Sequence, residues 1–172
     1  MIVNGKSLLE LSPIENMIDR KERLHGVSYG LSEAGYDVCI KQAIRFCADE
    51  GQMSVYKKGM LLGQERWCFE SRGRFTIAST IERFTMPDCL VGVVHDKSTW
   101  ARCGLSVFNT VIECGWKGYL TLELVYHGSD ELIIPAGSGI AQVLFSRIEN
   151  PASYAGGKYD NQEDRPIEAR FV

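Results

Sequence analysis

A series of short apolar segments separated by turn-forming residues is the feature that most restricts the fold of this 172-residue chain. From Tyr29 onward these segments are bounded by Gly, Pro, Asp and Asn, and several alternate apolar with polar side chains. The clearest of them read GYDVCI, RFTIAST, LVGVVH, GLSVFNT, YLTLELVY, LIIPAG and IAQVLFSRI. Alternation with a period of two is typical of half-buried β-strands. Strands at such even spacing predict an all-β (mainly β) protein, either a barrel or a jelly-roll-like sandwich.

The two ends of the chain depart from this strand pattern. Leu8, Leu9 and Leu11 form a short helical register before Pro13, so we expect a short N-terminal helix. Residues 150–172 are rich in Gly, Pro, Asn and charge, and such a tail is either frayed or a segment that orders over another surface. No boundary for a second domain is visible, so residues 1–172 are expected to form a single domain that ends in this tail.

Charge and cysteine usage restrict the partners and the compartment of the protein. The net charge of -3 and the isoelectric point near 5.7 argue against a nucleic-acid partner. No apolar run approaches the roughly 18 residues that a membrane span requires, so no membrane partner is expected. The six cysteines form no Cys-x-x-Cys pair, and the chain opens with MIVNGKSLLE rather than an apolar signal segment. We therefore expect reduced thiols and a cytoplasmic protein.

One polar bend, DKSTWARCGL at residues 96–105, gathers several potential anion ligands. Lys97, Ser98, Thr99 and Arg102 supply two cations and two hydroxyl groups within this short stretch. Oxyanions prefer charge-assisted donors in a fixed array, so the bend is a candidate phosphate cradle. Most polar turns bind nothing, and a solvated loop explains the same residues.

Glu123 lies in the middle of the apolar segment GYLTLELVYHG. In a strand, Thr121 and Val125 point to the same face as Glu123, whereas the neighbouring leucines point to the opposite face. Burying an unpaired carboxylate costs several kcal/mol, so such a group neutralises, finds a cation or has a function. The residues leave two interpretations open. Glu123 is either a partly exposed glutamate paired with an arginine, or a general acid and base whose pKa is raised by an apolar pocket.

Four further residues have both a structural and a functional interpretation. Glu113 precedes the Cys114-Gly115 turn signal and is either an exposed turn carboxylate or a ligand-binding group. Trp116 is either core or the wall of a site. Lys158 and Gln162 in the tail are surface residues unless the tail orders over a ligand.

Taken together, these segments resemble the dCTP deaminase branch of the superfamily shared by dUTPases and dCTP deaminases. The resemblance runs from about residue 32 to residue 170 and keeps the order of the motifs. SEAGYDV looks like the first motif, and the block that ends in DKSTWARCGL looks like the phosphate motif. IECGWKG is similar to the Ile-Asp-x-Gly-aromatic-x-Gly turn, GSGIAQVLF to a later strand, and GGKYDNQ to the tail of the deaminases.

The resemblance implies a distorted jelly-roll-like β-barrel of the dUTPase-like type that assembles as a homotrimer with active sites between subunits. It also implies a pyrimidine deoxynucleotide ligand, Mg²⁺ on its phosphates, and a C-terminal tail that closes over it. In this family the deaminases carry Leu-Glu in the strand of Glu123. The resemblance therefore makes Glu123 the general acid and base, with Ser98 and Arg102 holding the water and orienting the glutamate. The implied substrate-binding residues are Lys97, Thr99, Val111, Glu113, Trp116, Tyr154, Lys158 and Gln162.

The expected reaction is hydrolytic deamination of a deoxycytidine nucleotide, most simply dCTP to dUTP and ammonia. The zinc-dependent cytidine deaminases carry His-x-Glu and Pro-Cys-x-x-Cys motifs. Neither motif occurs in this chain, so zinc is not expected. No protein ligands for a metal are predicted.

Three departures from the family pattern leave alternative functions open. The loop at Asn109–Val111 is about two residues shorter than the family pattern, Glu113 replaces an Asp, and the stretch from Tyr154 to Lys158 is tight. The alternatives are a dUTPase or bifunctional enzyme, a deaminase of dCMP or of a modified cytosine nucleotide, and a non-catalytic nucleotide-binding regulator.

Overall fold

The computed structural model describes residues 1–171, and strands dominate this part of the chain. The elements are β1 (Ile2–Val3), α1 (Gly5–Leu11), β2 (Lys21–Leu24), β3 (Val27–Leu31), β4 (Tyr36–Cys39), β5 (Ile44–Asp49), β6 (Gln52–Leu61), β7 (Gln64–Arg72), β8 (Phe75–Thr85), β9 (Leu90–Asp96), α2 (Ser98–Ala101), β10 (Leu105–Val107), β11 (Val111–Ile112), β12 (Lys117–Tyr126), β13 (Leu132–Ile134) and β14 (Gly139–Arg147). The all-β prediction is confirmed, and so is the short N-terminal helix, which ends at Leu11 before a left-handed Ser12.

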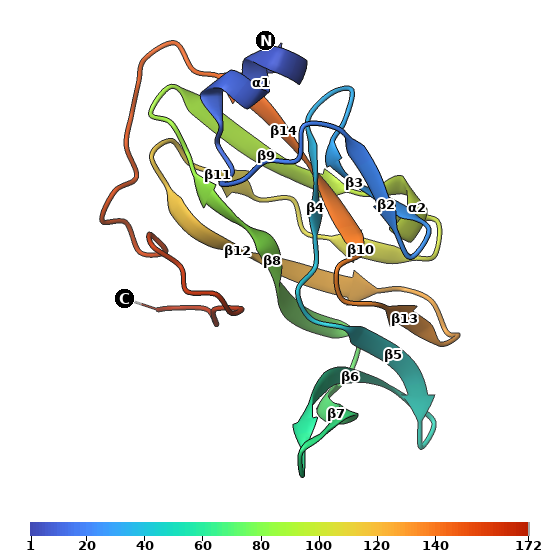
Figure 1. Cartoon of the computed structure of the whole chain (residues 1–172). Helices are drawn as coiled ribbons and strands as arrows, with labels where there is room; N and C mark the ends of the chain where they lie inside the picture. Colours follow the sequence, from blue (N-terminus) through green and yellow to red (C-terminus); the bar gives the residue numbers. More distant parts are fainter. Residues whose placement is uncertain (172) are drawn as a thin grey trace.

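The strands form three antiparallel sheets (Figure 1). The largest has the order β11-β9-β14-β4-β3-β2, with β1 also paired to β14. A second sheet, β10-β12-β8, lies against it, and buried side chains from both sheets belong to one hydrophobic cluster. The third sheet, β13-β5-β6-β7, extends from the end of this body (Figure 1). The arrangement is the distorted β-barrel that the resemblance implies.

All seven segments singled out in the sequence contain a strand, but the hairpin of β6 and β7 was not anticipated. Its strands project from the barrel, and most side chains of β7 are at least partly exposed. Apart from the buried start of β6, the hairpin therefore shows little apolar alternation for sequence reasoning to detect. Strand β2, which is also largely exposed, was missed for the same reason.

Strand β12 alternates as the sequence predicts. Leu120, Leu122, Leu124 and Tyr126 are all buried and at most 7% exposed. Neighbouring strand β8 pairs antiparallel with β12, and Glu123 lies opposite Ile77. The face that carries Leu122, Leu124 and Tyr126 is therefore fixed in the core, and Glu123 points away from it.

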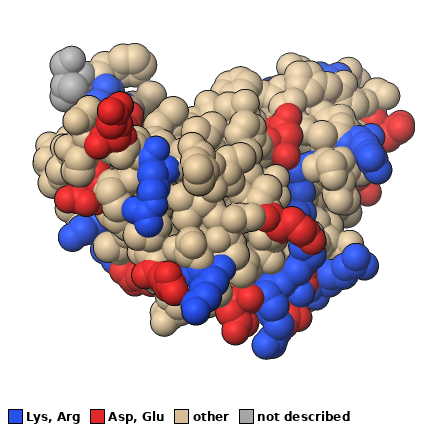
Figure 2. Space-filling view, turned by 90° about the horizontal axis from the view of Figure 1, so that it is seen from above, with Lys and Arg blue, Asp and Glu red and all other residues tan. Residues whose placement is uncertain are grey.

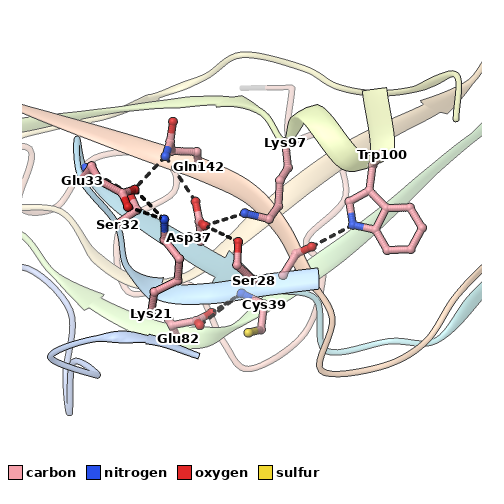
Figure 3. Close-up of polar contacts among 12 residues, drawn as sticks. Lys21, Ser28, Ser32, Glu33, Asp37, Cys39, Glu82, Lys97, Trp100 and Gln142 are labelled. Atoms are coloured by element: carbon pink, nitrogen blue, oxygen red, sulfur yellow. Dashed lines mark hydrogen bonds and ion pairs between the residues drawn. The ribbon is translucent and has the colours of Figure 1, made fainter. Parts of the chain in front are cut away.

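A buried ion pair joins the segment before α2 to strand β4 (Figure 3). The Lys97 ammonium lies 2.5 Å from the Asp37 carboxylate, and both side chains are less than a tenth exposed. Ser28 donates to the same carboxylate at 3.2 Å, and the Gln142 amide donates at 3.3 Å. Trp100 of α2 adds an indole N–H bond of 2.7 Å to the carbonyl of Gly139. These contacts fix the start and the body of α2 on the large sheet.

The surface shows mixed charge. On the face in Figure 2, acidic and basic side chains are interspersed instead of forming one continuous basic surface. Within residues 1–171, no helix has the length and apolar character needed to cross a membrane. All six cysteines are free thiols.

The buried pair makes a prediction about stability. Replacing Lys97 with Met should lower the free energy of unfolding by about 3 kcal/mol, because it leaves the Asp37 carboxylate buried without its cation. The matched control is Lys58→Met, since Lys58 pairs with Glu65 on the surface and exposed pairs contribute about 0–1 kcal/mol. Urea unfolding at one fixed protein concentration measures both changes. Equal losses for the two variants would contradict the role of the pair, and adding Asp37→Asn to Lys97→Met should recover part of the loss.

Candidate active site

A pocket of about 420 Å³ lies on the face of β8 and β12 that points away from the core. Its volume is within the usual range for small-molecule sites. The two strands form its floor, the turn after β11 forms one side, and the C-terminal tail forms another. The lining residues are Phe75, Ile77, Thr110, Val111, Ile112, Glu113, Trp116, Leu120, Thr121, Glu123, Tyr154, Tyr159, Gln162, Ile167, Glu168 and Ala169.

Glu123 is a partly buried carboxylate in this pocket. Within residues 1–171, its carboxylate has no hydrogen-bond or ion-pair partner from another side chain. Burial raises the pKa of Glu123 above its ordinary value, and a backbone hydrogen bond at the same residue opposes that effect. Of the two interpretations that the sequence leaves open, the surface ion pair with an arginine is therefore not observed in the single chain. The geometry is that of a carboxyl group able to exchange a proton with a bound molecule.

The turn after β11 supplies a rigid aromatic wall. Gly115 has a φ of 74°, a left-handed conformation that suits glycine, and the turn brings Trp116 back beneath the tail. Trp116 is buried and donates its indole N–H to the carbonyl of Tyr159 at 2.6 Å. Glu113 and Val111 are exposed at the rim of the same pocket.

The C-terminal tail runs beside the sheet of β8 and β12 instead of fraying (Figure 1), and several of its residues line the pocket. Gln162 forms a parallel bridge with Gly118, and its carbonyl accepts the backbone N–H of Tyr119 at 3.2 Å. Ile167 is buried and lines the pocket, although it lies in a polar segment. Tyr154 donates its backbone N–H to the carbonyl of Cys114 at 2.7 Å, which joins the tail to the turn after β11. Lys158 is exposed outside the pocket lining, with its ammonium 5.4 Å from the centre of the Tyr159 ring.

The polar bend before and within α2 is not part of this pocket. None of Lys97, Ser98, Thr99 and Arg102 lines it, and in Figure 1 α2 lies on the opposite side of the molecule from the tail. The ammonium of Lys97 is engaged by Asp37, whereas Ser98, Thr99 and Arg102 are exposed. One chain therefore brings together Glu123, Val111, Glu113, Trp116, Tyr154 and Gln162 but leaves the α2 residues apart.

The charged groups that line the pocket in residues 1–171 are Glu113, Glu123 and Glu168, with no lysine or arginine among the lining residues. No group of three or more His, Cys, Asp or Glu side chains in this part of the chain is placed to hold a metal ion. A polyanionic ligand therefore needs cations from outside this pocket.

Sequence reasoning missed several residues of the site. Thr121 shares the parity of Glu123, so the strand pattern places it on the same face, but nothing in the sequence indicates a partner for it. Tyr159, Ile167 and Glu168 belong to a tail whose path depends on tertiary contacts. Phe75 of β8 was missed as well, because its place in the pocket follows from its pairing with Val125.

Another partly buried carboxyl group, Glu82 on β8, lies outside this pocket. Both of its oxygens accept the backbone N–H of Cys39, at 3.1 and 3.0 Å, which ties β8 to β4 (Figure 3). Burial raises the pKa of Glu82 to about 7. Glu82 is thus engaged by the backbone, whereas Glu123 is free to meet a ligand.

Comparison with known proteins identifies related sequences. The family model described as dCTP deaminase-like matches residues 13–148. The chain is 33% identical over 160 residues to a dCTP deaminase of Anaplasma phagocytophilum (strain HZ), covering 88% of this chain and 86% of that protein. It is 36% identical over 146 residues to a dCTP deaminase of Campylobacter concisus (strain 13826), covering 80% and 78%.

Solved structures resemble the fold. A dUTPase of Staphylococcus bacteriophage 80alpha, in a complex with dUpNHpp, aligns with a TM-score of 0.50 at 15% identity over 88% of this chain and 92% of that chain. A dUTPase from phage phi11 of S. aureus aligns with a TM-score of 0.50 at 16% identity over 80% and 88%. These alignments confirm the dUTPase-like all-β fold.

The raised pKa of Glu123 predicts a pH dependence of stability. A carboxyl group that binds its proton more tightly in the folded state makes the free energy of unfolding fall as pH rises from the unfolded pKa to the folded pKa. Glu123→Gln removes this effect, so the melting temperature of the variant relative to wild type should rise between pH 4 and pH 8. A difference in melting temperature that is constant over this range would show that the pKa of Glu123 is not raised.

Proposed function

The chain belongs to the dCTP deaminase-like family, and from this we propose that it deaminates dCTP hydrolytically to dUTP and ammonia, with Glu123 as its general acid and base. The observation that carries the proposal is the position of Glu123: an unpaired, partly buried carboxyl group in a pocket of about 420 Å³. Residues 1–172 would act as one domain, with 150–172 as a tail that closes over the substrate.

A single carboxyl group is sufficient for the proton transfers of this reaction. The Glu123 carboxylate accepts a proton from water as the water oxygen bonds to C4 of cytosine, and it passes this proton to N3. It then transfers the proton of the new hydroxyl group to the amino nitrogen. The C4–N bond breaks, ammonia leaves, and a C4 carbonyl forms with N3 protonated. A pKa raised toward the working pH supports both steps, because the group must accept and donate in turn.

The walls of the pocket are suited to the neutral part of the nucleotide. Trp116 and the tail tyrosines offer flat apolar surfaces next to Glu123, against which a sugar and a base can pack. Glu113 and Val111 at the rim would contact the sugar and the edge of the base. The three glutamates of the pocket disfavour the phosphates, which must therefore extend toward a different surface.

We propose that this surface belongs to a second copy of the chain in a homotrimer. Ser98, Thr99 and Arg102 are exposed and lie away from the pocket of their own chain, so a neighbouring subunit would present them to the substrate. Ser98 and Arg102 would hold the water and orient Glu123, while Thr99, with Lys158 and Gln162 of the tail, would contact phosphate oxygens. Lys97 is engaged by Asp37, and its contribution would be to fix this segment in place.

Magnesium enters the proposal with the phosphates of the nucleotide. We propose that the ion is held mainly by the triphosphate; among the described residues there is no cluster of three metal ligands. Mg²⁺ would supply charge neutralisation of the phosphates. We expect the protein to act in the cytoplasm without zinc.

One observation favours a second candidate activity. Glu113 is an exposed carboxylate on the same pocket as Glu123, at the position where the family pattern has an Asp beside the sugar. A carboxylate there is able to activate water against the α-phosphate of dUTP, which would make the enzyme bifunctional. The longer Glu side chain departs from the family pattern, so deamination remains the leading proposal.

The products distinguish the candidates. Purified protein is incubated with dCMP, dCDP, dCTP or dUTP and Mg²⁺, and ammonia and pyrophosphate are assayed separately. We expect ammonia from dCTP. Pyrophosphate from dUTP would add the dUTPase activity, and binding of dCTP with neither product would contradict the proposal in favour of a nucleotide-binding regulator.

A mixing experiment tests the shared site. Glu123→Gln and Arg102→Ala should each be inactive alone, but refolding or co-expressing them together should restore about a quarter of the wild-type activity. This fraction follows because random mixing joins a wild-type Glu123 to a neighbour's wild-type Arg102 in about one site in four. No recovery in mixed oligomers would show that each site is built from one chain.

A further inference from the structure

Thr121 connects the floor of the pocket to the tail that covers it. Its hydroxyl oxygen accepts the backbone N–H of Ile167 at 3.0 Å and lies 3.1 Å from the side-chain oxygen of Gln162. Thr121 is only 7% exposed, and it precedes Glu123 by two residues on the same face of β12. The hydroxyl group therefore makes both of its hydrogen bonds with the tail.

The hydrogen bonds of Thr121 define the orientation of the Gln162 amide in the structure. The N–H of Ile167 donates to the Thr121 oxygen, and the Thr121 hydroxyl donates its single hydrogen to Gln162. The atom that receives this hydrogen is the amide oxygen Oε1. The amide nitrogen Nε2 carries two hydrogens, and within residues 1–171 it has no hydrogen-bond partner. Since Gln162 lines the pocket, Nε2 is left as a donor for a bound molecule.

The backbone of the tail is fixed beside the same strand. Gly118 has a φ of 128°, and a Cβ atom at this position would lie 2.4 Å from the backbone nitrogen of Gln162. Such a contact is far inside van der Waals distance, so the tail occupies space that only a glycine leaves open. Gly118 sets the position of the Gln162 backbone, and Thr121 sets the direction of its side chain.

We propose that Thr121 is a positioning residue for substrate binding, which acts by holding the Gln162 amide with its nitrogen directed at an acceptor oxygen of the nucleotide. The inference rests on the proposed function. An uncharged donor matters in this pocket because its charged lining groups are Glu113, Glu123 and Glu168, which cannot donate when ionised. Gln162 therefore provides an uncharged donor inside the pocket that can bind an oxygen of the substrate.

The test compares Thr121→Val with wild type and with a matched control. Valine keeps the shape of threonine but removes both hydrogen bonds. We expect the KM for dCTP to rise about tenfold, the effect of one lost uncharged hydrogen bond, with kcat within about twofold because Glu123 is untouched. Hydrogen exchange at the amide of Ile167 should become faster. Thr121→Ser should restore the wild-type KM and the wild-type exchange rate of the Ile167 amide.

Thr80→Val is the matched control. Thr80 is also a buried strand threonine with two hydrogen bonds, from the N–H of Leu120 at 3.1 Å and to the carbonyl of Glu82 at 2.9 Å, but it does not line the pocket. It should lower the melting temperature without changing the KM for dCTP. The proposal would be overturned if the KM of Thr121→Val matched that of wild type or of Thr80→Val. It would also be overturned if Thr121→Ser did not restore the wild-type KM.

A double-mutant cycle with Gln162→Ala separates positioning from general damage. If Thr121 acts through Gln162, Thr121→Val should add less than about twofold to KM once Gln162 is Ala. If the effects of the two substitutions on KM were fully additive in free energy, the mechanism would be contradicted.

If the wild-type protein released no ammonia, the proposed function would fail by itself. The same cycle, measured as dCTP dissociation constants by calorimetry in the Glu123→Gln background, would still decide the role of Thr121. Comparing dCMP with dCTP shows whether the acceptor oxygen lies on the nucleoside monophosphate portion or on the outer phosphates.

Discussion

The alternation of side chains along β12 is the constraint on which the site depends. Leu122 and Leu124 are almost completely buried between the sheets, and this burial fixes the register of the strand. A shift of one residue would place Glu123 in the core and a leucine in the pocket. The cost of burying an unpaired carboxylate and exposing the leucines excludes that arrangement. The same packing that stabilises the barrel therefore holds one acidic side chain at the floor of the pocket.

The chain builds only part of the proposed site, and the division has a physical basis. The pocket is acidic, so the cations that a triphosphate needs must come from elsewhere. The exposed groups proposed to complete the site, Ser98, Thr99 and Arg102, lie on the bend at α2, and the buried pair of Lys97 with Asp37 fixes that bend on the large sheet. Two neighbouring residues thus differ in role: Lys97 stabilises the fold through its ion pair, whereas Ser98 is exposed and accessible to a partner subunit. In the proposed shared site, assembly would be a condition for activity.

The parts of the structure that follow from local patterns were predictable from the sequence. The leucine face of β12 and the short helix before Pro13 were read from periodicity, and the motif order gave the barrel and the family. The hairpin of β6 and β7 was not, because most of its side chains outside the start of β6 are at least partly exposed and show little alternation. The burial of Lys97 was also hidden, since its partner Asp37 is distant in sequence. Likewise, the contact of Thr121 with Ile167 exists only through the path of the tail.

The central claim is that the Glu123 carboxyl group transfers the protons of deamination. The most direct measurement is the kcat for ammonia release from dCTP by Glu123→Gln, together with the dissociation constant for dCTP. Glutamine keeps the size of the side chain but exchanges no proton, so kcat should fall about a hundredfold or more while binding stays near the wild-type value. A variant that turns over dCTP at close to the wild-type rate would contradict the account.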